Sequence, residues 1–385
     1  MRESEPGAGR LVLARLGLAL TSLLFSLGSV ELGLRAAGYE PLVEVEDKRL
    51  QLIEPSEDPV LAYELRPGAT GRIWKCDVQI NSLGMRDREY EPVRPEGTRR
   101  VLALGDSITF GNRLELEKTW TSLYEDNLAR RGIACEVLNM GVGGYDTLQE
   151  VRLLERAGLE LDPDLVVLSF CVNDVATVSV SLEALERAKK LESSLLVRTR
   201  IGQWLALQSL RRQEEDSHRR RRDAELEGLE HLDDPELRRL SLRVAELLPD
   251  TLPDTPPEGV GEESARVELE HLWWYRDTRR LSRVRQAFER LSELAGEHDF
   301  RVVFFCVPFL GEAKSPLREA WHAVYAMIDH EARRAGFRVV DMLPALEEDG
   351  LTAIRVKTND PIHPNGRGHR TLARVLAADT ARLLH

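Results

Sequence analysis

The sequence predicts an α/β fold in which helices cover both faces of a parallel central sheet. Five short segments are continuously apolar, amphipathic helical patterns separate them, and glycine or polar residues follow the first three. Strands buried on both faces are apolar throughout, and strands joined by helices run parallel. The chain of 385 residues is long enough for one large domain with insertions, or for two domains. Its net charge of -12 gives no indication of a nucleic-acid partner.

Residues 1–36 are predicted to be a cytoplasmic tip and a transmembrane signal anchor. Residues 11–30 are apolar except for Arg15, and 20 helical residues span about 30 Å, the thickness of a bilayer core. Arginines on the N-terminal side favour a cytoplasmic N-terminus, which places the catalytic domain in the periplasm or on the cell surface. A signal peptide cleaved near residues 26–28, with a secreted product, is the alternative. A buried core helix is disfavoured at the chain end.

Residues 37–97 are predicted to form a small β-rich lead-in. Prolines punctuate the segment, residues 72–80 (RIWKCDVQI) are expected to form a strand, and residues 81–84 a turn. Residues 98–385 are predicted to be the main domain. Its expected strands are residues 99–104, 134–139, 165–170, 301–307 and 338–342, and its expected helices include residues 120–131, 147–157 and 367–384. In such sheets the site lies beyond the carboxyl ends of the strands.

A charge-rich, mostly helical insertion is predicted at about residues 178–297, and it is a candidate lid over the site. The four-arginine run at residues 219–222 is interpreted as a solvated helix face, and residues 271–275 (HLWWY) as packing. The four cysteines contain no C-x-x-C pair, so neither a zinc site nor a disulfide framework is indicated. No cofactor or metal is expected.

The first candidate catalytic motif directly follows the first strand, at residues 105–111 (GDSITFG). A small residue before a sharp strand-to-helix turn can leave the Ser107 side chain exposed at the sheet edge, with its N–H directed at an oxyanion. A capping serine in an ordinary turn gives the same letters.

The second motif is Asp360-Pro-Ile-His363, just before the last predicted helix. In a tight turn this spacing can place the carboxylate beside the imidazole, so that Asp360 fixes the tautomer while His363 takes the serine proton. Helix capping by Asp360 with a surface His363 is the alternative interpretation. His369 lies inside the helix and is expected to be a face residue rather than a base.

Two further blocks follow the second and third predicted strands. Residues 139–147 (NMGVGGYDT) supply glycines whose backbone N–H groups can approach a ligand closely, and residues 171–174 (CVND) supply the amide of Asn173. A glycine N–H and an asparagine side chain are suitable donors for the oxygen of a tetrahedral intermediate.

These four blocks, in this order and at strand ends, resemble the SGNH (GDSL-type) hydrolase superfamily. The resemblance covers about residues 99–174 and the tail from about residue 338, and residues 1–36 with residues 81–87 (NSLGMRD) resemble its membrane-anchored bacterial members. It implies a flavodoxin-like three-layer α/β/α sandwich that hydrolyses carboxylic esters. It further implies Ser107 as nucleophile, Asp360 and His363 as the rest of a triad, and an oxyanion hole of Ser107, Gly144 and Asn173.

The chain departs from the family pattern at two positions. Cys171 stands where the family has glycine, and its larger side chain is expected to narrow the pocket or shift Asn173. Tyr145 extends the glycine block, which leaves Gly143 as an alternative to Gly144.

The expected function is a serine esterase acting on small-molecule or glycan esters, with short-chain acyl or O-acetyl groups. An O-acyltransferase acting on cell-envelope glycans with the same triad is one alternative, and a catalytically dead glycan-binding scaffold is another.

Overall fold

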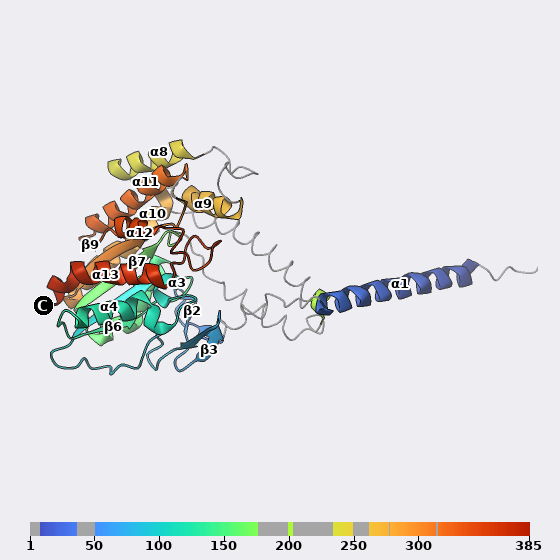
Figure 1. The fold of residues 1–385 in the computed structure, drawn as a ribbon, viewed down its shortest axis with the longest axis horizontal. Helices are drawn as coiled ribbons and strands as arrows, with labels where there is room; N and C mark the ends of the chain where they lie inside the picture. Colours follow the sequence, from blue (N-terminus) through green and yellow to red (C-terminus); the bar gives the residue numbers. More distant parts are fainter. Residues whose placement is uncertain are drawn as a thin grey trace, which may run out of the picture. The chain divides into compact units, whose positions relative to one another are not determined.

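A computed structural model describes residues 8–36, 51–175, 199–202, 234–248, 262–276, 278–312 and 315–385, and it confirms the α/β fold (Figure 1). The chain divides into two compact units. One comprises residues 1–48 and 183–224, and the other residues 49–182 and 225–385. The second unit contains the candidate site residues and, within the described ranges, every strand. The lead-in and the predicted catalytic domain therefore share one compact unit.

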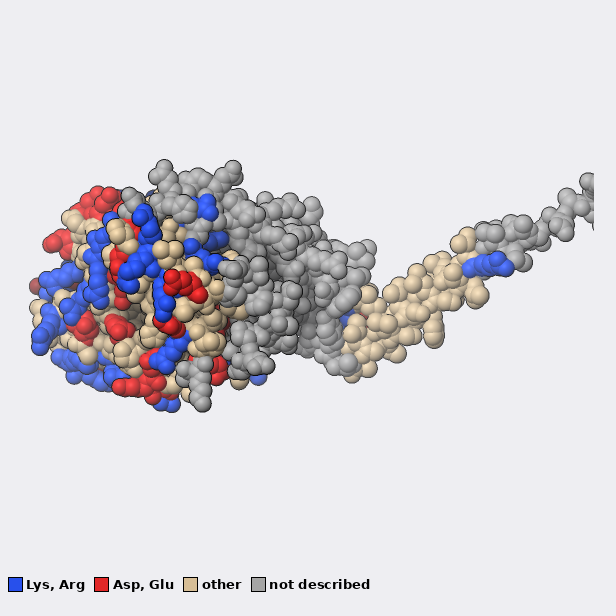
Figure 2. Space-filling view, turned by 90° about the horizontal axis from the view of Figure 1, so that it is seen from above, with Lys and Arg blue, Asp and Glu red and all other residues tan. Residues whose placement is uncertain are grey.

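The described part of the first unit is mainly α1 (Ala8–Ala36). Large apolar side chains on this helix are exposed to solvent, and Phe25 is 77% exposed. Figure 2 shows a helix surface that is mostly uncharged. The stretch Arg15–Ala36 has a mean hydropathy of 1.5 and is long and apolar enough to cross a membrane. Signal sequences share these properties, so the helix fits either a membrane anchor or a signal sequence.

A five-stranded parallel sheet, in the order β6-β5-β7-β8-β9, forms the centre of the second unit. The expected strands are present, although the fifth contains only two residues. Their bounds are β5 (Arg99–Gly105), β6 (Cys135–Asn139), β7 (Leu165–Cys171), β8 (Arg301–Val307) and β9 (Arg338–Val339). β6, β5 and β7 are adjacent parallel strands, with β6 at one side of the sheet, so their carboxyl ends lie along the same sheet edge, where the predicted motifs begin.

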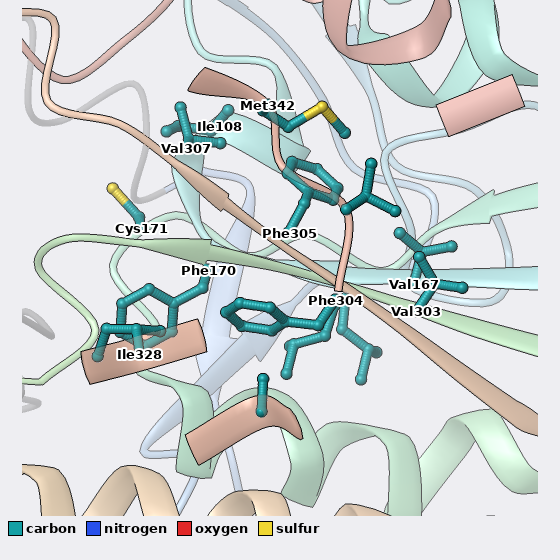
Figure 3. Close-up of a cluster of buried hydrophobic side chains, with 14 of the residues drawn as sticks. Ile108, Val167, Phe170, Cys171, Val303, Phe304, Phe305, Val307, Ile328 and Met342 are labelled. Atoms are coloured by element: carbon teal, nitrogen blue, oxygen red, sulfur yellow. The ribbon is translucent and has the colours of Figure 1, made fainter. Parts of the chain in front are cut away.

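Helices cover both faces of this sheet, and two adjacent phenylalanines of β8 show the alternation. The Phe305 ring packs edge-on against Trp120 of α4 (Trp120–Ala129), whereas the Phe304 ring packs against Phe288 of α10 (Thr278–His298). The first face also carries α13 (Gly366–Leu384), and the second carries α5 (Thr147–Leu153) and α11 (Arg318–Arg334). The rings of Phe170 and Phe304 lie in one apolar cluster (Figure 3). The three layers fix the sheet edge rigidly.

The second unit also contains other helical elements. They are α3 (Ser107–Phe110), η1 (Leu116–Lys118), η2 (Leu154–Gly158, a π-helix), η3 (Leu159–Leu161), α8 (Pro235–Leu247), α9 (Glu262–Trp274) and α12 (Leu343–Asp349). The described parts of the predicted insertion include α8, α9 and α10, while the arginine run at residues 219–222 lies outside the described residues. Leu272 and Tyr275 are fully buried, as expected for packing residues.

The lead-in contains two antiparallel hairpins, β1 (Ile53–Pro55) with β2 (Tyr63–Leu65), and β3 (Thr70–Ile73) with β4 (Cys76–Gln79). The prediction of one strand over residues 72–80 was therefore wrong. Trp74 and Lys75 form the turn with left-handed φ angles of 49° and 71°. Such turns usually contain Asn-Gly or Asp-Gly, so this sequence carries no signal for the turn. The four cysteines, all described, are free thiols.

Candidate active site

The predicted nucleophile stands on a sharp turn between β5 and α3. Gly105 has a φ of +154°, and a Cβ added there would lie 2.1 Å from the Thr109 Oγ1. The turn therefore requires glycine. Asp106 caps the helix, because its Oδ1 accepts a 2.9 Å hydrogen bond from the Ile108 N–H. Ser107 is consequently the first residue of α3, at the carboxyl edge of the sheet.

Ser107, His363 and Asp360 form a continuous chain of hydrogen bonds. The Ser107 Oγ lies 2.8 Å from the His363 Nε2, and the His363 Nδ1 lies 2.9 Å and 3.0 Å from the two Asp360 carboxylate oxygens. Burial raises the pKa of Asp360, but the hydrogen bond and the charge of His363 outweigh it and hold that pKa below its usual value. A carboxylate that stays ionised orients the imidazole for proton transfer from a serine. The structure thus brings these three predicted residues together.

A buried arginine holds the loop that carries His363. The Arg355 Nε donates to the Leu310 carbonyl (2.7 Å) and its Nη1 to the Thr358 carbonyl (2.8 Å). The Leu310 N–H in turn donates to the Pro361 carbonyl at 2.7 Å. These bonds tie the segment after β8 to the Asp360–His363 turn. Sequence reasoning missed Arg355, since a single arginine outside any motif gives no signal.

The glycine block packs directly on the nucleophile helix. A Cβ added to Gly141 would lie 2.3 Å from the Phe110 backbone nitrogen, so only glycine allows this approach. A Cβ at Gly143 would lie 3.8 Å from the Ser107 Cβ, which places this residue against the nucleophile. Gly144 follows with a left-handed φ of 89°. The loop therefore places Gly143 against Ser107, with Gly144 next to it in the chain.

Two hydrogen bonds hold the turn that carries Asn173. The Cys171 N–H donates to the Asp174 Oδ2 (2.8 Å), and the Tyr275 hydroxyl donates to the Val172 carbonyl (2.8 Å). Cys171 is 1% exposed, and Figure 3 shows its side chain among the buried apolar residues. The Asn173 Oδ1 is buried and has no hydrogen-bond partner within the described residues.

Two fully buried acids lie close to this turn. Burial, together with the negative charge of Asp106, raises the pKa of Glu150 and of Asp174 well above the usual range for carboxyl groups. Sequence reasoning missed Glu150, which reads as an ordinary polar residue in an amphipathic helix.

Hydrogen bonds from the lead-in hold the C-terminal end of α3, the short helix that begins at Ser107. Arg86 is 2% exposed, and its Nη1 donates to the carbonyls of Phe110 (2.8 Å) and Gly111 (2.6 Å). Its Nη2 donates to the Leu114 carbonyl. The Asp87 Oδ2 accepts a 2.9 Å bond from the backbone of the glycine block. The 81–87 segment thus braces both catalytic loops, a role that its sequence did not reveal.

One group of metal-ligating side chains occurs within the described ranges, at Asp234, His330 and Glu331. Arg285 donates to both carboxylate oxygens of Glu331 (2.5 Å and 2.6 Å) and lies 3.6 Å from Asp234. These ligand atoms already belong to an ion-pair network centred on a guanidinium, and they do not fit a cation.

Comparison with known proteins identifies the same region. A model of the GDSL-like lipase/acylhydrolase family matches residues 103–371. An arylesterase from Vibrio mimicus is 32% identical over 79 residues, which cover 20% of this chain and 40% of that protein. The solved structure of TesA is 14% identical to this chain, and the match covers 74% of this chain and 99% of the TesA chain, with a TM-score of 0.40. The solved structure of Axe2, an acetylxylan esterase from Geobacillus stearothermophilus, is 14% identical to this chain. The match covers 73% of this chain and 93% of Axe2, with a TM-score of 0.40.

Proposed function

We propose that this chain, which belongs to the GDSL-like lipase/acylhydrolase family, is a carboxylic ester hydrolase that cleaves its substrate through an acyl-enzyme on Ser107. The observation that carries this proposal is the continuous hydrogen-bond chain from Ser107 through His363 to Asp360. A serine hydroxyl is a weak nucleophile until an adjacent base can take its proton. Here the base lies within hydrogen-bond distance, and a carboxylate orients it.

The proposed reaction has two halves. In the first, the His363 Nε2 takes the hydroxyl proton while the Ser107 Oγ attacks the ester carbonyl carbon, and the protonated His363 then gives that proton to the leaving alcohol oxygen. In the second, His363 takes a proton from water while the water oxygen attacks the acyl carbonyl carbon. The bond between that carbon and the Ser107 Oγ then breaks, the protonated His363 returns the proton to the Oγ, and the carboxylic acid leaves. We assign the oxyanion hole to the backbone N–H groups of Ser107 and Gly144 and to the side-chain amide of Asn173.

The proposed substrate is a short-chain acyl or O-acetyl ester of a cell-envelope glycan. This proposal is supported by the expected location of the catalytic unit, which the N-terminal helix would anchor on the outer side of a membrane. A panel of esters of increasing chain length, with acetylated glycans included, tests it. We expect turnover to be highest with acetyl groups, and a maximum at long acyl chains would contradict it.

Replacing the nucleophile tests the mechanism. The Ser107→Ala protein is expected to fold like the wild type and to lose nitrophenyl acetate hydrolysis by at least about 10³-fold. Ser82→Ala is a matched control, since this exposed serine bonds Glu89 on the surface of the lead-in and should leave turnover unchanged. Full activity of Ser107→Ala would rule out the acyl-enzyme.

A further inference from the structure

The peptide unit between Gly143 and Gly144 is held by a residue from outside the four motifs. Tyr63 of β2 is 2% exposed, and its hydroxyl donates a 2.7 Å hydrogen bond to the Gly143 carbonyl. The peptide is trans and planar, so the Gly143 C=O and the Gly144 N–H point in opposite directions. Fixing this carbonyl toward Tyr63 therefore directs the Gly144 N–H away from the tyrosine.

Such a constraint matters because two consecutive glycines allow the peptide between them to rotate easily. If this peptide unit rotated by half a turn, the Gly143 carbonyl oxygen would take the place of the Gly144 N–H in the site. A carbonyl oxygen at that position would repel the oxyanion. Gly143 lies against Ser107, so the orientation of this one peptide determines what the reacting carbonyl meets. A buried hydrogen bond from a phenol favours the productive orientation.

Tyr63 is itself firmly placed. Its ring packs on the ring of Tyr145 with centroids 5.4 Å apart, and the Tyr145 hydroxyl donates to the Tyr63 carbonyl. The Gln149 Nε2 adds bonds to the carbonyls of Val60 and Leu61, both at 3.2 Å. The lead-in hairpin and the glycine block are thus bonded to each other reciprocally, and the tyrosine hydroxyl has little freedom to leave the Gly143 carbonyl.

We propose that Tyr63 is a positioning residue of the oxyanion hole, which orients the Gly144 N–H toward the substrate oxyanion through its hydrogen bond to the Gly143 carbonyl. The proposal rests on the proposed function, because it assumes acyl transfer at Ser107. It makes the β-rich lead-in a functional part of the catalytic centre.

The test is the Tyr63→Phe variant of the full-length protein, which keeps the ring and removes only the hydroxyl. We expect kcat for nitrophenyl acetate to fall about tenfold, with KM changed less than twofold. The affinity for a short alkyl boronic acid, which forms a tetrahedral adduct with serine, should fall in parallel. Tyr124→Phe is the matched control, because this buried tyrosine of α4 loses an equivalent hydrogen bond, to the Thr380 Oγ1 of α13, and we expect an unchanged kcat.

The outcomes separate this inference from the proposed function. If Tyr63→Phe keeps the wild-type kcat and boronic-acid affinity while Ser107→Ala is inactive, the positioning role is wrong and the acyl-enzyme stands. If the wild type itself hydrolyses no ester, the proposed function fails. Should Tyr63→Phe not fold, Tyr145→Phe weakens the same support from the other side. It is expected to lower kcat by a smaller factor, and an unchanged kcat would again overturn the inference.

Discussion

At the scale of single residues, the Ser107 hydroxyl has two acceptors within reach. The Asp106 Oδ2 lies 3.0 Å away and the His363 Nε2 lies 2.8 Å away, but a hydroxyl has only one proton to donate. The Asp106 Oδ1 accepts from the Ile108 N–H and caps α3, which leaves the Oδ2 to face the hydroxyl, whereas the imidazole can accept the serine proton and then pass it on. In the proposed mechanism, activation of Ser107 depends on the bond to His363, and stabilisation of the negative charge of the tetrahedral intermediate depends on the proposed oxyanion donors.

The assignment of Asn173 leads to a prediction at this scale. Asn173→Ala removes one proposed donor, and loss of a single oxyanion donor costs about 10²–10³ in kcat. We expect a decrease in this range with little change in KM, measured by steady-state ester hydrolysis. Asn127→Ala on α4, away from the site, is the control. A kcat within threefold of the wild type would remove Asn173 from the oxyanion hole.

Sequence patterns located the proposed catalytic residues but not the residues that hold them in place. Ser107 and His363 occur in recognisable motifs, and the structure brings them within hydrogen-bond distance of each other. Tyr63, Arg86 and Arg355 act through bonds to backbone carbonyls, and a carbonyl acceptor exists at every residue. No pattern in the sequence specifies which carbonyl a distant side chain will reach.

At the scale of elements, α13 and α4 are joined by a buried histidine. His369 is 1% exposed, and its Nδ1 accepts a 2.9 Å bond from the Trp120 N–H at the start of α4. Burial, with a contribution from the charge of His363, lowers the pKa of His369 to about 3. It is a neutral packing residue on the inner face of its helix, in agreement with the expectation that it is no base.

This histidine makes stability depend on pH. The pKa of an unfolded histidine is about 6.5, so the unfolded state binds a proton that the folded state excludes, and stability is lost as pH falls below about 6.5. His369→Gln keeps an acceptor for the Trp120 N–H and removes this titration. Between pH 7 and pH 5 we expect the variant to lose about 2 kcal/mol less unfolding free energy than the wild type, measured by urea denaturation. The exposed His298→Gln is the control, and equal losses in all three proteins would contradict the account.

The strands of the central sheet could be predicted from the sequence, whereas the β3–β4 hairpin could not. The strands of the central sheet are apolar throughout because both faces are covered, and this signal is strong. The β3–β4 hairpin was missed because Trp74 and Lys75 adopt left-handed backbone angles that their side chains do not favour. Tertiary packing, rather than local preference, stabilises that turn.

At the scale of the whole molecule, the lead-in and the sheet share a second apolar cluster. Its members come from both segments: Leu52, Leu61, Tyr63, Leu65, Ile73, Val78, Ile80, Phe110, Val142 and Tyr145. Phe110 ends the nucleophile helix and Val142 lies in the glycine block, so this cluster lies directly behind both catalytic loops. The catalytic unit therefore begins with the lead-in.

Truncation tests this division of the chain. A protein that begins at Arg49 lacks the N-terminal helix α1 but keeps the complete second unit, and we expect it to be folded with kcat within twofold of the full chain. A protein that begins at Thr98 loses Arg86 and exposes the apolar cluster, and we expect it to aggregate or to lose at least about 10²-fold in kcat. Activity assays and size-exclusion chromatography distinguish them. Wild-type kcat in the shorter protein would show that the lead-in is dispensable.

The central claim is that Ser107 is the nucleophile, activated by His363 and Asp360. The most direct measurement is labelling of the full-length protein with a fluorophosphonate probe, followed by mass spectrometry of its peptides. The account predicts a single adduct on Ser107, its absence in Ser107→Ala, and slower labelling in His363→Ala. An adduct on another residue, or an active wild-type enzyme that the probe leaves unlabelled, would contradict it.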